Sequence, residues 1–268
     1  MSPALGASTV LHLAPHADDE LIGAPATLMA LRDAGWRVVN LTCSLGRPEQ
    51  RPRRRAEVTE ACRRAGFVSE VADQPLPDPL DKGGMPEAER QVTTTITTVV
   101  RRWGPRLVVG PSPHDRHGGH EVVGRSALAV CAALGDQAPE RLWLWGLWGD
   151  LPFPSLALAF GEERLQEILS ALAAHAGELE RNDYRRLVRG RAEMNASLGP
   201  ERVFGFGTHA PGHQYVEVLT ELGRDRGSWR LGRPRWLDAR CAIGELGPVE
   251  LDRWLESASL TDTFGPPP

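Results

Sequence analysis

Short apolar runs alternate with longer segments of mixed polarity through the first half of the chain. Runs rich in aliphatic and β-branched residues predict strands, and these are Val10–Ala14, Val38–Cys43, Leu107–Gly110 and Leu142–Trp145. The segments between them have apolar residues at helical spacing and predict helices at Ala24–Ala34, Arg53–Ala65, Glu87–Arg102 and Glu121–Leu134. This alternation predicts an α/β fold in which helices cover both faces of a mostly parallel sheet.

The second half of the chain has a less regular pattern. Residues 162–197 are rich in Leu, Ala, Arg and Glu and predict one or two amphipathic helices. The segments Val203–Gly207 and Tyr215–Leu219 predict short strands. We therefore expect a Rossmann-like core over residues 1–160. Residues 161–268 are expected to form a helical and short-strand extension that completes the same domain and ends in a loose, proline-rich tail.

A polar cluster, Pro15-His16-Ala17-Asp18-Asp19-Glu20, follows directly after the first predicted strand. His16 offers an imidazole nitrogen to a metal ion and Asp19 offers an oxygen, which leaves Asp18 free to act as a base on water bound to the metal. The alternative is that the acidic residues cap the next helix, since carboxylates favour a helix N-terminus. Capping accounts for the carboxylates but not for the histidine.

A second polar cluster, His114–Glu121, follows the predicted strand at Leu107–Gly110 and contains three histidines. It can supply a third metal ligand, and catalytic zinc usually has three protein ligands with one position left for water. Ligands of open α/β sheets bind outside the carboxyl ends of the strands, where both clusters fall. The two clusters together favour a hydrolytic metal site over a helix cap.

The two clusters resemble the motifs of the PIG-L/LmbE-like zinc-dependent N-deacetylases. The first family motif reads Pro-His-Pro-Asp-Asp-Glu, and this chain has Ala17 in place of the second proline. The second reads His-Pro-Asp-His before a helix, and here Gly118 and Gly119 stand between His117 and His120. Other segments that follow the family are Gly46, the helix start Arg54–Glu57 and Asp81–Met85. The resemblance is close over residues 8–135 and loose over the remainder.

The resemblance implies one bound Zn²⁺ with His16, Asp19 and His120 as its ligands. It also implies that Asp18 is the general base and that His117 protonates the leaving amine or stabilises the oxyanion. These roles describe an amide hydrolase that acts on a linear amide.

The resemblance further implies substrate contacts by Arg54 and Asp81, which match positions that hold the sugar in related enzymes. Some relatives have a tyrosine two residues before the histidine that aligns with His117. This chain has Asp115 there, so a phenol that could stabilise the oxyanion is missing from that position.

Aromatic residues cluster around the fourth predicted strand. Trp143 and Trp145 alternate along it and are expected in the core, whereas Trp148 and Phe153 follow it among glycines and prolines. We expect the latter two at the mouth of the site, where exposed aromatics suit sugar faces, acyl chains or an aromatic carrier. His175 lies in the helical region, where a surface or half-buried histidine is more common than a metal ligand.

The function that follows is hydrolysis of an N-acetyl or N-acyl group from an amino sugar on a larger glycoconjugate. The aromatic mouth favours a large carrier such as a glycopeptide-antibiotic pseudoaglycone, and a mycothiol-type or aminoglycoside-precursor deacetylase is the alternative. A nucleotide-binding module is disfavoured, because acidic residues stand after the first strand in place of a Gly-x-Gly-x-x-Gly turn. A non-catalytic sugar-binding protein would have no use for Asp18.

Composition adds little to this interpretation. The chain has 268 residues and a net charge of −4, and its only basic run is Arg51–Arg55, so nucleic-acid binding is not supported. No apolar run is long enough to span a bilayer, and no charged leader precedes an apolar core. The four cysteines have no paired spacing, which predicts reduced core thiols in a cytoplasmic protein.

Overall fold

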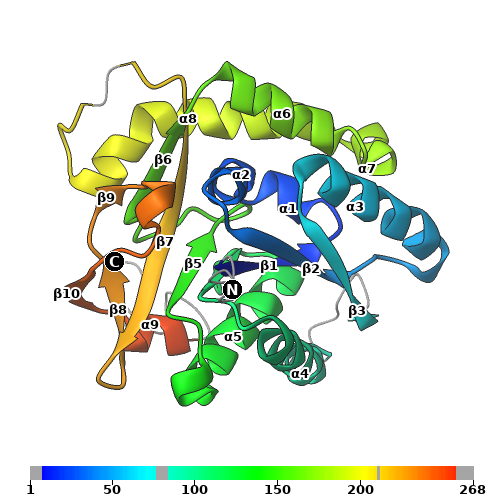
Figure 1. Cartoon of the computed structure of the whole chain (residues 1–268), viewed down its shortest axis with the longest axis horizontal. Coiled ribbons are helices and arrows are strands. Elements are labelled where there is room, and N and C mark those ends of the chain that lie inside the picture. The colour runs from blue at the N-terminus through cyan, green and yellow to red at the C-terminus, as the bar shows by residue number, and fades with distance from the viewer. Residues whose placement is uncertain (1–7, 77–83, 210–211, 258–268) are drawn as a thin grey trace, which may run out of the picture.

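The computed structural model describes residues 8–76, 84–209 and 212–257 (Figure 1). Its strands are β1 (Thr9–His16), β2 (Arg37–Ser44), β3 (Val68–Leu76), β4 (Leu107–Pro111), β5 (Arg141–Trp145), β6 (Leu156–Phe160), β7 (Tyr215–Asp225), β8 (Ser228–Gly232), β9 (Arg235–Trp236) and β10 (Leu246–Glu250). Its α-helices are α1 (Asp19–Ile22), α2 (Pro25–Asp33), α3 (Arg51–Ala65), α4 (Met85–Trp103), α5 (Gly118–Ala133), α6 (Glu162–Leu172), α7 (Ala176–Arg181), α8 (Tyr184–Phe204) and α9 (Asp252–Glu256). Short 3-10 turns occur at Pro48–Gln50, Gly135–Gln137 and Ala239–Cys241.

The first five strands form a parallel sheet in the order β3-β2-β1-β4-β5. The chain winds outward from β1 in one direction to β3 and then returns to continue with β4 on the other side of β1. In open α/β sheets this reversal of strand order marks the place where ligands bind, at the carboxyl ends of the two central strands. The predicted α/β class with a Rossmann-like, mostly parallel sheet is confirmed.

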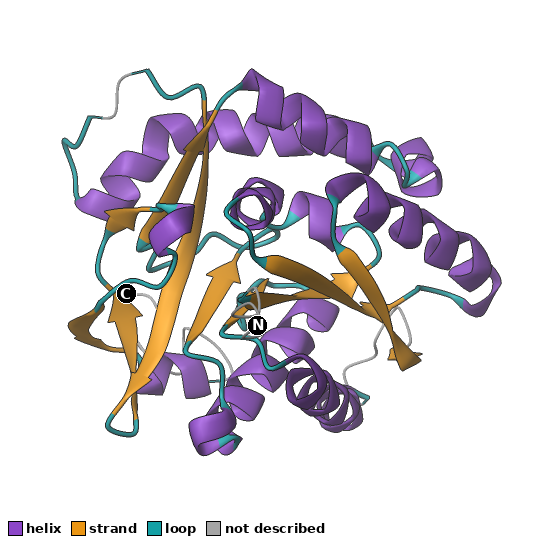
Figure 2. Ribbon diagram, viewed as in Figure 1, coloured by secondary structure: helices purple, strands orange, loops and turns teal. Residues whose placement is uncertain are grey.

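The later strands continue this sheet in antiparallel fashion. The long strand β7 pairs with β5 and β8, and β8 pairs with β10. β7 also pairs with β6, which in turn pairs in parallel with the short β9. The chain after residue 160 thus shares a sheet with the parallel strands, as Figure 2 shows in orange.

Helices cover both faces of the parallel strands (Figure 2). Val10 of β1 packs in a core cluster with residues of α2, α3, α6 and α8. Leu11 and Leu13 pack in a second cluster, with residues of α4 and α5. Side chains alternate between the two faces of a strand, so a strand that is buried on both faces has an almost continuous apolar sequence. This explains why the first apolar run of the chain is unbroken apart from His12.

The predicted strands and helices of the first half are present, with ends shifted by a few residues. β3 and β6 were not predicted, and the helical region 162–197 contains three helices, α6, α7 and α8. The predicted strand at Val203–Gly207 is wrong. Its first two residues end α8, and Gly205 (φ 106°) and Gly207 (φ 86°) adopt left-handed backbone conformations that break any strand.

Three of the four cysteines are buried in the core, and the fourth is exposed. Cys43, Cys62 and Cys131 are free and buried as predicted, whereas Cys241 is free but exposed, because it lies in a 3-10 turn outside the core. Within the described residues, no helix combines the length and the apolar character needed to cross a bilayer.

Candidate active site

A cavity of about 550 Å³ opens at the carboxyl end of β1. The end of this strand delivers the first polar cluster, and the N-terminus of α5 delivers the second, because β4 lies beside β1 in the sheet. Asp81, one of the predicted sugar contacts, lies outside the described residues. The predicted site residues that line the cavity are His16, Asp18, Asp19, Arg54, His117, His120 and Trp148.

The three predicted zinc ligands come together with suitable spacing. Oδ2 of Asp19 lies 3.2 Å from His16 Nδ1 and 3.5 Å from His120 Nε2. Donor atoms at about 2.0–2.1 Å from a tetrahedral zinc lie about 3.3–3.4 Å apart, so these separations fit one ion. Burial alone would raise the pKa of Asp19, but His120 and His16 lower it well below its usual range. Asp19 is therefore an anionic donor at neutral pH.

His117 lies within ligand reach as well. His16, His117 and His120 each offer a nitrogen, and these atoms lie within 4.8 Å of one another. The ring of His117 also stacks on Trp148, with ring centroids 5.7 Å apart. Gly119 lets the helix approach this close, because a Cβ there would lie 3.0 Å from His16 Nε2. The three histidine nitrogens thus form one possible donor set, and Asp19 adds a carboxylate beside His16 and His120.

Asp115 connects His120 to the loop that carries Trp148. Its Oδ2 accepts a hydrogen bond from His120 Nδ1 at 2.7 Å, which leaves His120 Nε2 directed at the metal donors. Its Oδ1 accepts the backbone N–H groups of Leu147, Trp148 and Gly149 at 2.6, 3.1 and 3.1 Å. From sequence, Asp115 was noted only for the absence of a tyrosine. The available signal is an acidic residue five positions before a predicted ligand histidine.

The Asp18 side chain is buried in the wall of the cavity and does not act as a helix cap. Asp18 occupies the N-cap position of α1, but its side chain accepts no hydrogen bond from the described backbone of that helix. Its backbone has φ 140°, a conformation that costs a non-glycine residue ~1–3 kcal/mol. Burial, together with the charge of Asp19, raises the pKa of Asp18 to about 8. A divalent cation at the neighbouring donors would favour its ionised form.

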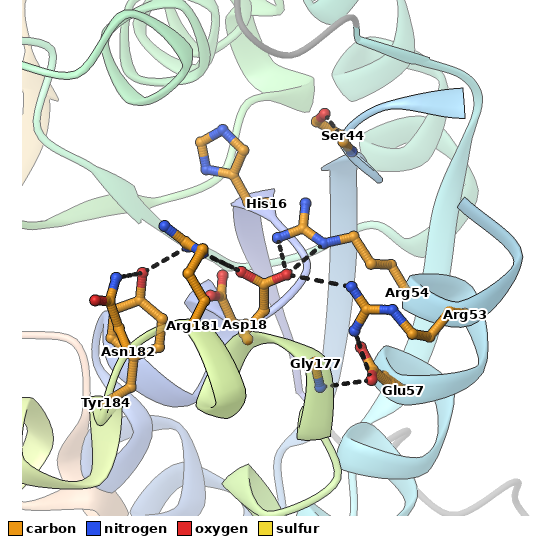
Figure 3. A network of polar contacts seen from close by, with 12 residues as sticks. His16, Asp18, Ser44, Arg53, Arg54, Glu57, Gly177, Arg181, Asn182 and Tyr184 are labelled. Carbon is orange, nitrogen blue, oxygen red and sulfur yellow. Dashed lines mark hydrogen bonds and ion pairs between the residues drawn. The ribbon is translucent and has the colours of Figure 1, made fainter. Parts of the chain in front are cut away.

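Arg54 forms a wall of the cavity together with Glu178 and Arg181 of α7. Its Nε and Nη2 donate to Glu178 Oε1 at 2.9 and 2.7 Å, and Arg181 donates to the other oxygen of Glu178 at 2.8 Å. Figure 3 shows Arg54 and Arg181 reaching from opposite sides towards the space beside Asp18. Burial alone would raise the pKa of Glu178, but Arg181 and Arg54 lower it.

The two predicted mouth aromatics have different positions. Trp148 is 56% exposed and lines the cavity. Phe153 does not line it, and instead packs edge to face on Trp254 at 5.4 Å within the second core cluster. The expectation for Phe153 is therefore corrected, because α9 covers the segment that follows Trp148. Trp143 and Trp145 are buried in the core as predicted.

The expectation that His175 is a surface or half-buried residue is also wrong. The side chain is completely buried, and its Nε2 lies 2.6 Å from Glu20 Oε1. Its buried partner is Glu20 of the first motif, a long-range contact that local helical periodicity does not report.

The comparisons with known proteins agree with the motifs. Residues 11–133 match the family model described as PIG-L: GlcNAc-PI de-N-acetylase. These residues form a PIG-L family domain. The PIG-L family that the two motifs predict is thus confirmed for this domain. No curated protein sequence matches the chain.

Solved structures share the fold of this chain. N,N'-diacetylchitobiose deacetylase from Pyrococcus horikoshii is 18% identical with a TM-score of 0.61, covering 81% of this chain and 84% of that one. The zinc-inhibited form of teicoplanin deacetylase Orf2 is 17% identical with a TM-score of 0.61, covering 82% and 100%. GalB, the 4-carboxy-2-hydroxymuconate hydratase of Pseudomonas putida KT2440, is 17% identical with a TM-score of 0.56, covering 81% and 97%. At these identities the likeness concerns the fold, and the fold also supports a hydratase.

Proposed function

We propose that this protein is a zinc-dependent hydrolase that removes an N-acetyl group from an amino sugar on a larger glycoconjugate. The observation that carries the proposal is the position of Asp18 in the cavity wall beside a donor set formed by His16, Asp19 and His120. A sugar-binding protein or a structural metal site would not need a carboxylate held beside the metal donors in a strained backbone conformation.

Asp18, His117 and Asp115 have different roles in the proposed hydrolysis. When bound, zinc would polarise the amide carbonyl and lower the pKa of the attacking water. Asp18 accepts the proton from that water as the general base. His117 protonates the leaving amine and helps to stabilise the oxyanion. Asp115 holds His120 in the tautomer that presents Nε2 to the metal.

The walls of the cavity favour a sugar with a short acyl group. Arg54, Glu178, Arg181 and Tyr184 offer hydrogen-bonding groups for hydroxyls. Apolar contact is limited to a few residues such as Ile22 and the exposed Trp148, and no apolar channel that could hold a long acyl chain is formed by the described lining residues. An acetyl group on an amino sugar fits this lining better than a fatty acyl group.

The carrier of the sugar is proposed from the exposed ring at the mouth. Trp148 can cover a sugar face or an aromatic aglycone outside the cavity. Similar folds include a teicoplanin deacetylase and a chitobiose deacetylase, which supports either a glycopeptide pseudoaglycone or an oligosaccharide as the carrier. A mycothiol-type or aminoglycoside precursor is the alternative carrier.

Acetate release from a panel of N-acetylated sugars tests the proposal. The panel comprises N-acetylglucosamine, diacetylchitobiose, an aryl N-acetylglucosaminide and an N-acetylglucosaminyl glycopeptide pseudoaglycone. The metal-free protein is compared with protein given one equivalent of zinc. Excess zinc is avoided, because a teicoplanin deacetylase of similar fold has a zinc-inhibited form. We expect zinc-dependent release that is fastest with the aromatic carriers. Binding of these sugars without any acetate release would instead indicate a sugar-binding protein.

A further inference from the structure

A buried histidine–carboxylate pair lies behind Asp18, and no role described above uses it. His175 Nε2 lies 2.6 Å from Glu20 Oε1, and both side chains are fully buried. Because a carboxylate oxygen only accepts, His175 donates its Nε2–H to Glu20. Glu20 belongs to α1 in the first motif, whereas His175 immediately precedes α7, so the pair joins segments 155 residues apart.

The second oxygen of Glu20 reaches the backbone of Asp18. Glu20 Oε2 accepts the Asp18 N–H at 3.1 Å. This is the peptide at which the chain adopts φ 140°, a value that non-glycine residues rarely take and that persists only when the surroundings enforce it. The hydrogen bond from Asp18 is therefore one of the contacts that hold the strained turn. Glu20 in turn is held by His175.

The surroundings of His175 indicate a positional role rather than a contribution to stability alone. Its Nδ1 is buried and has no hydrogen-bond partner among the residues that the structure describes. Burial alone would lower the pKa of His175, but Glu20, with Asp18 and Glu57, raises it. Buried ion pairs are weak sources of stability, because desolvation offsets much of the attraction, and their best-attested use is to specify one arrangement.

We propose that His175 is a positioning residue for Asp18, acting through Glu20 to hold the backbone of the base in the conformation that directs its carboxylate into the cavity. The proposal rests on the proposed function, since it takes Asp18 to be the general base. Catalytic groups must be held close to their productive geometry, and a displacement of about 1 Å can lower turnover about 100-fold.

The test compares variants of the full chain loaded with one equivalent of zinc. His175→Leu removes the donor at similar volume, and His175→Asn keeps a polar side chain that is too short to reach Glu20. His175→Gln keeps a donor of similar reach. Glu221→Gln is the matched control. Glu221 lies on β7, does not line the cavity, and is a fully buried carboxylate that accepts hydrogen bonds from Trp143 and Arg235.

The expected kinetic result separates positioning from folding. His175→Leu and His175→Asn should lower kcat about 10- to 100-fold, with KM and bound zinc within about two-fold of wild type. His175→Gln should recover most of kcat, and Glu221→Gln should lower the melting temperature without changing kcat. If His175→Leu does not fold, His175→Asn gives the same comparison. A kcat within two-fold of wild type in both donor-less variants would overturn the proposal, as would loss of zinc in parallel with activity.

A crystal structure of the same variants makes the test independent of the substrate. The proposal predicts that Asp18 leaves its positive φ when His175 no longer reaches Glu20, and that His175→Gln retains it. An unchanged Asp18 backbone in His175→Leu and His175→Asn would overturn the proposal. If the wild-type protein releases acetate from no N-acetylated sugar, the proposed function fails, and this structural comparison still decides whether His175 positions Asp18.

Discussion

Asp115 Oδ2 accepts a hydrogen bond from His120 Nδ1 at 2.7 Å, while Oδ1 of the same carboxylate holds three backbone N–H groups of the loop that carries Trp148. One buried carboxylate thus fixes the tautomer of a proposed zinc ligand and the position of the exposed ring at the mouth of the cavity. The proposed metal site and the mouth of the cavity therefore share one buried carboxylate.

Asp115→Asn should separate these two roles. The amide oxygen can still accept the three loop N–H groups, but the amide nitrogen is no acceptor for His120 Nδ1–H. Loss of such a carboxylate partner typically lowers metal affinity about 10- to 100-fold, and we expect zinc affinity to fall by this amount. Calorimetric zinc titration measures it. Unchanged affinity would mean that Asp115 serves the loop alone.

The choice between Asp19 and His117 as the third zinc ligand can be settled with alanine variants. We expect His16→Ala, Asp19→Ala and His120→Ala each to abolish stoichiometric zinc binding, because the remaining two donors hold a catalytic zinc poorly. His117→Ala should keep one zinc per chain and lose turnover instead. Metal analysis after gel filtration gives the answer, and loss of zinc from His117→Ala with retention in Asp19→Ala would reverse the assignment.

Trp148 and Phe153 should behave differently, although both were predicted at the mouth. Trp148→Ala should lower kcat/KM on an aryl-linked or pseudoaglycone-linked N-acetylglucosamine far more than on the free sugar, because contacts remote from the reacting bond contribute to turnover. Its melting temperature should stay close to that of wild type, since the ring is exposed. Equal losses on carrier-linked and free sugar would remove Trp148 from carrier binding.

Phe153→Ala serves as the paired control in that experiment. The ring packs on Trp254 in the core, so the substitution should lower the free energy of unfolding by up to about 3 kcal/mol and affect both substrates equally.

The stability of the metal-free protein should depend on pH through His175. Its pKa is raised in the folded protein, so the folded state binds this proton more tightly than the unfolded state does. The resulting stabilisation is fully present below the unfolded value near 6.5 and is lost as the pH rises through the folded value. Melting temperatures of wild type and His175→Gln from pH 5.5 to 9 measure the effect. The wild-type curve should fall more steeply above pH 6.5, and parallel curves would contradict this prediction.

Much of the site followed from the sequence because it depends on local order. His16 and Asp19 come at the end of an unbroken apolar strand, and His120 follows another such strand, so parallel topology alone brings them to one edge of the sheet. Asp18 is specified in the same way, by its place one residue before Asp19.

What sequence reasoning missed depends on contacts between distant segments. His175 is predicted to be exposed or half-buried because it lies in a region of helical spacing, which does not report contacts with distant elements. In the structure it lies between α6 and α7 and contacts Glu20 of α1. Phe153 is predicted at the mouth because it follows a strand among glycines and prolines. Its packing partner Trp254 lies about 100 residues later, where the local sequence gives no sign of the contact. The segment around Gly205 is predicted as a strand because its glycines alternate with apolar residues. In the structure it is the end of α8, followed by glycines with positive φ.

The most direct test of the account is turnover by zinc-loaded wild type and by Asp18→Asn on an aryl N-acetylglucosaminide, with bound zinc measured in the same samples. The amide keeps the shape of the carboxylate but cannot accept the proton of the attacking water. We expect one zinc per chain in both proteins, zinc-dependent acetate release by wild type, and kcat lower by about 10²–10⁴-fold in Asp18→Asn. Equal kcat in the two proteins, or no acetate release by wild type that carries one zinc, would contradict the account.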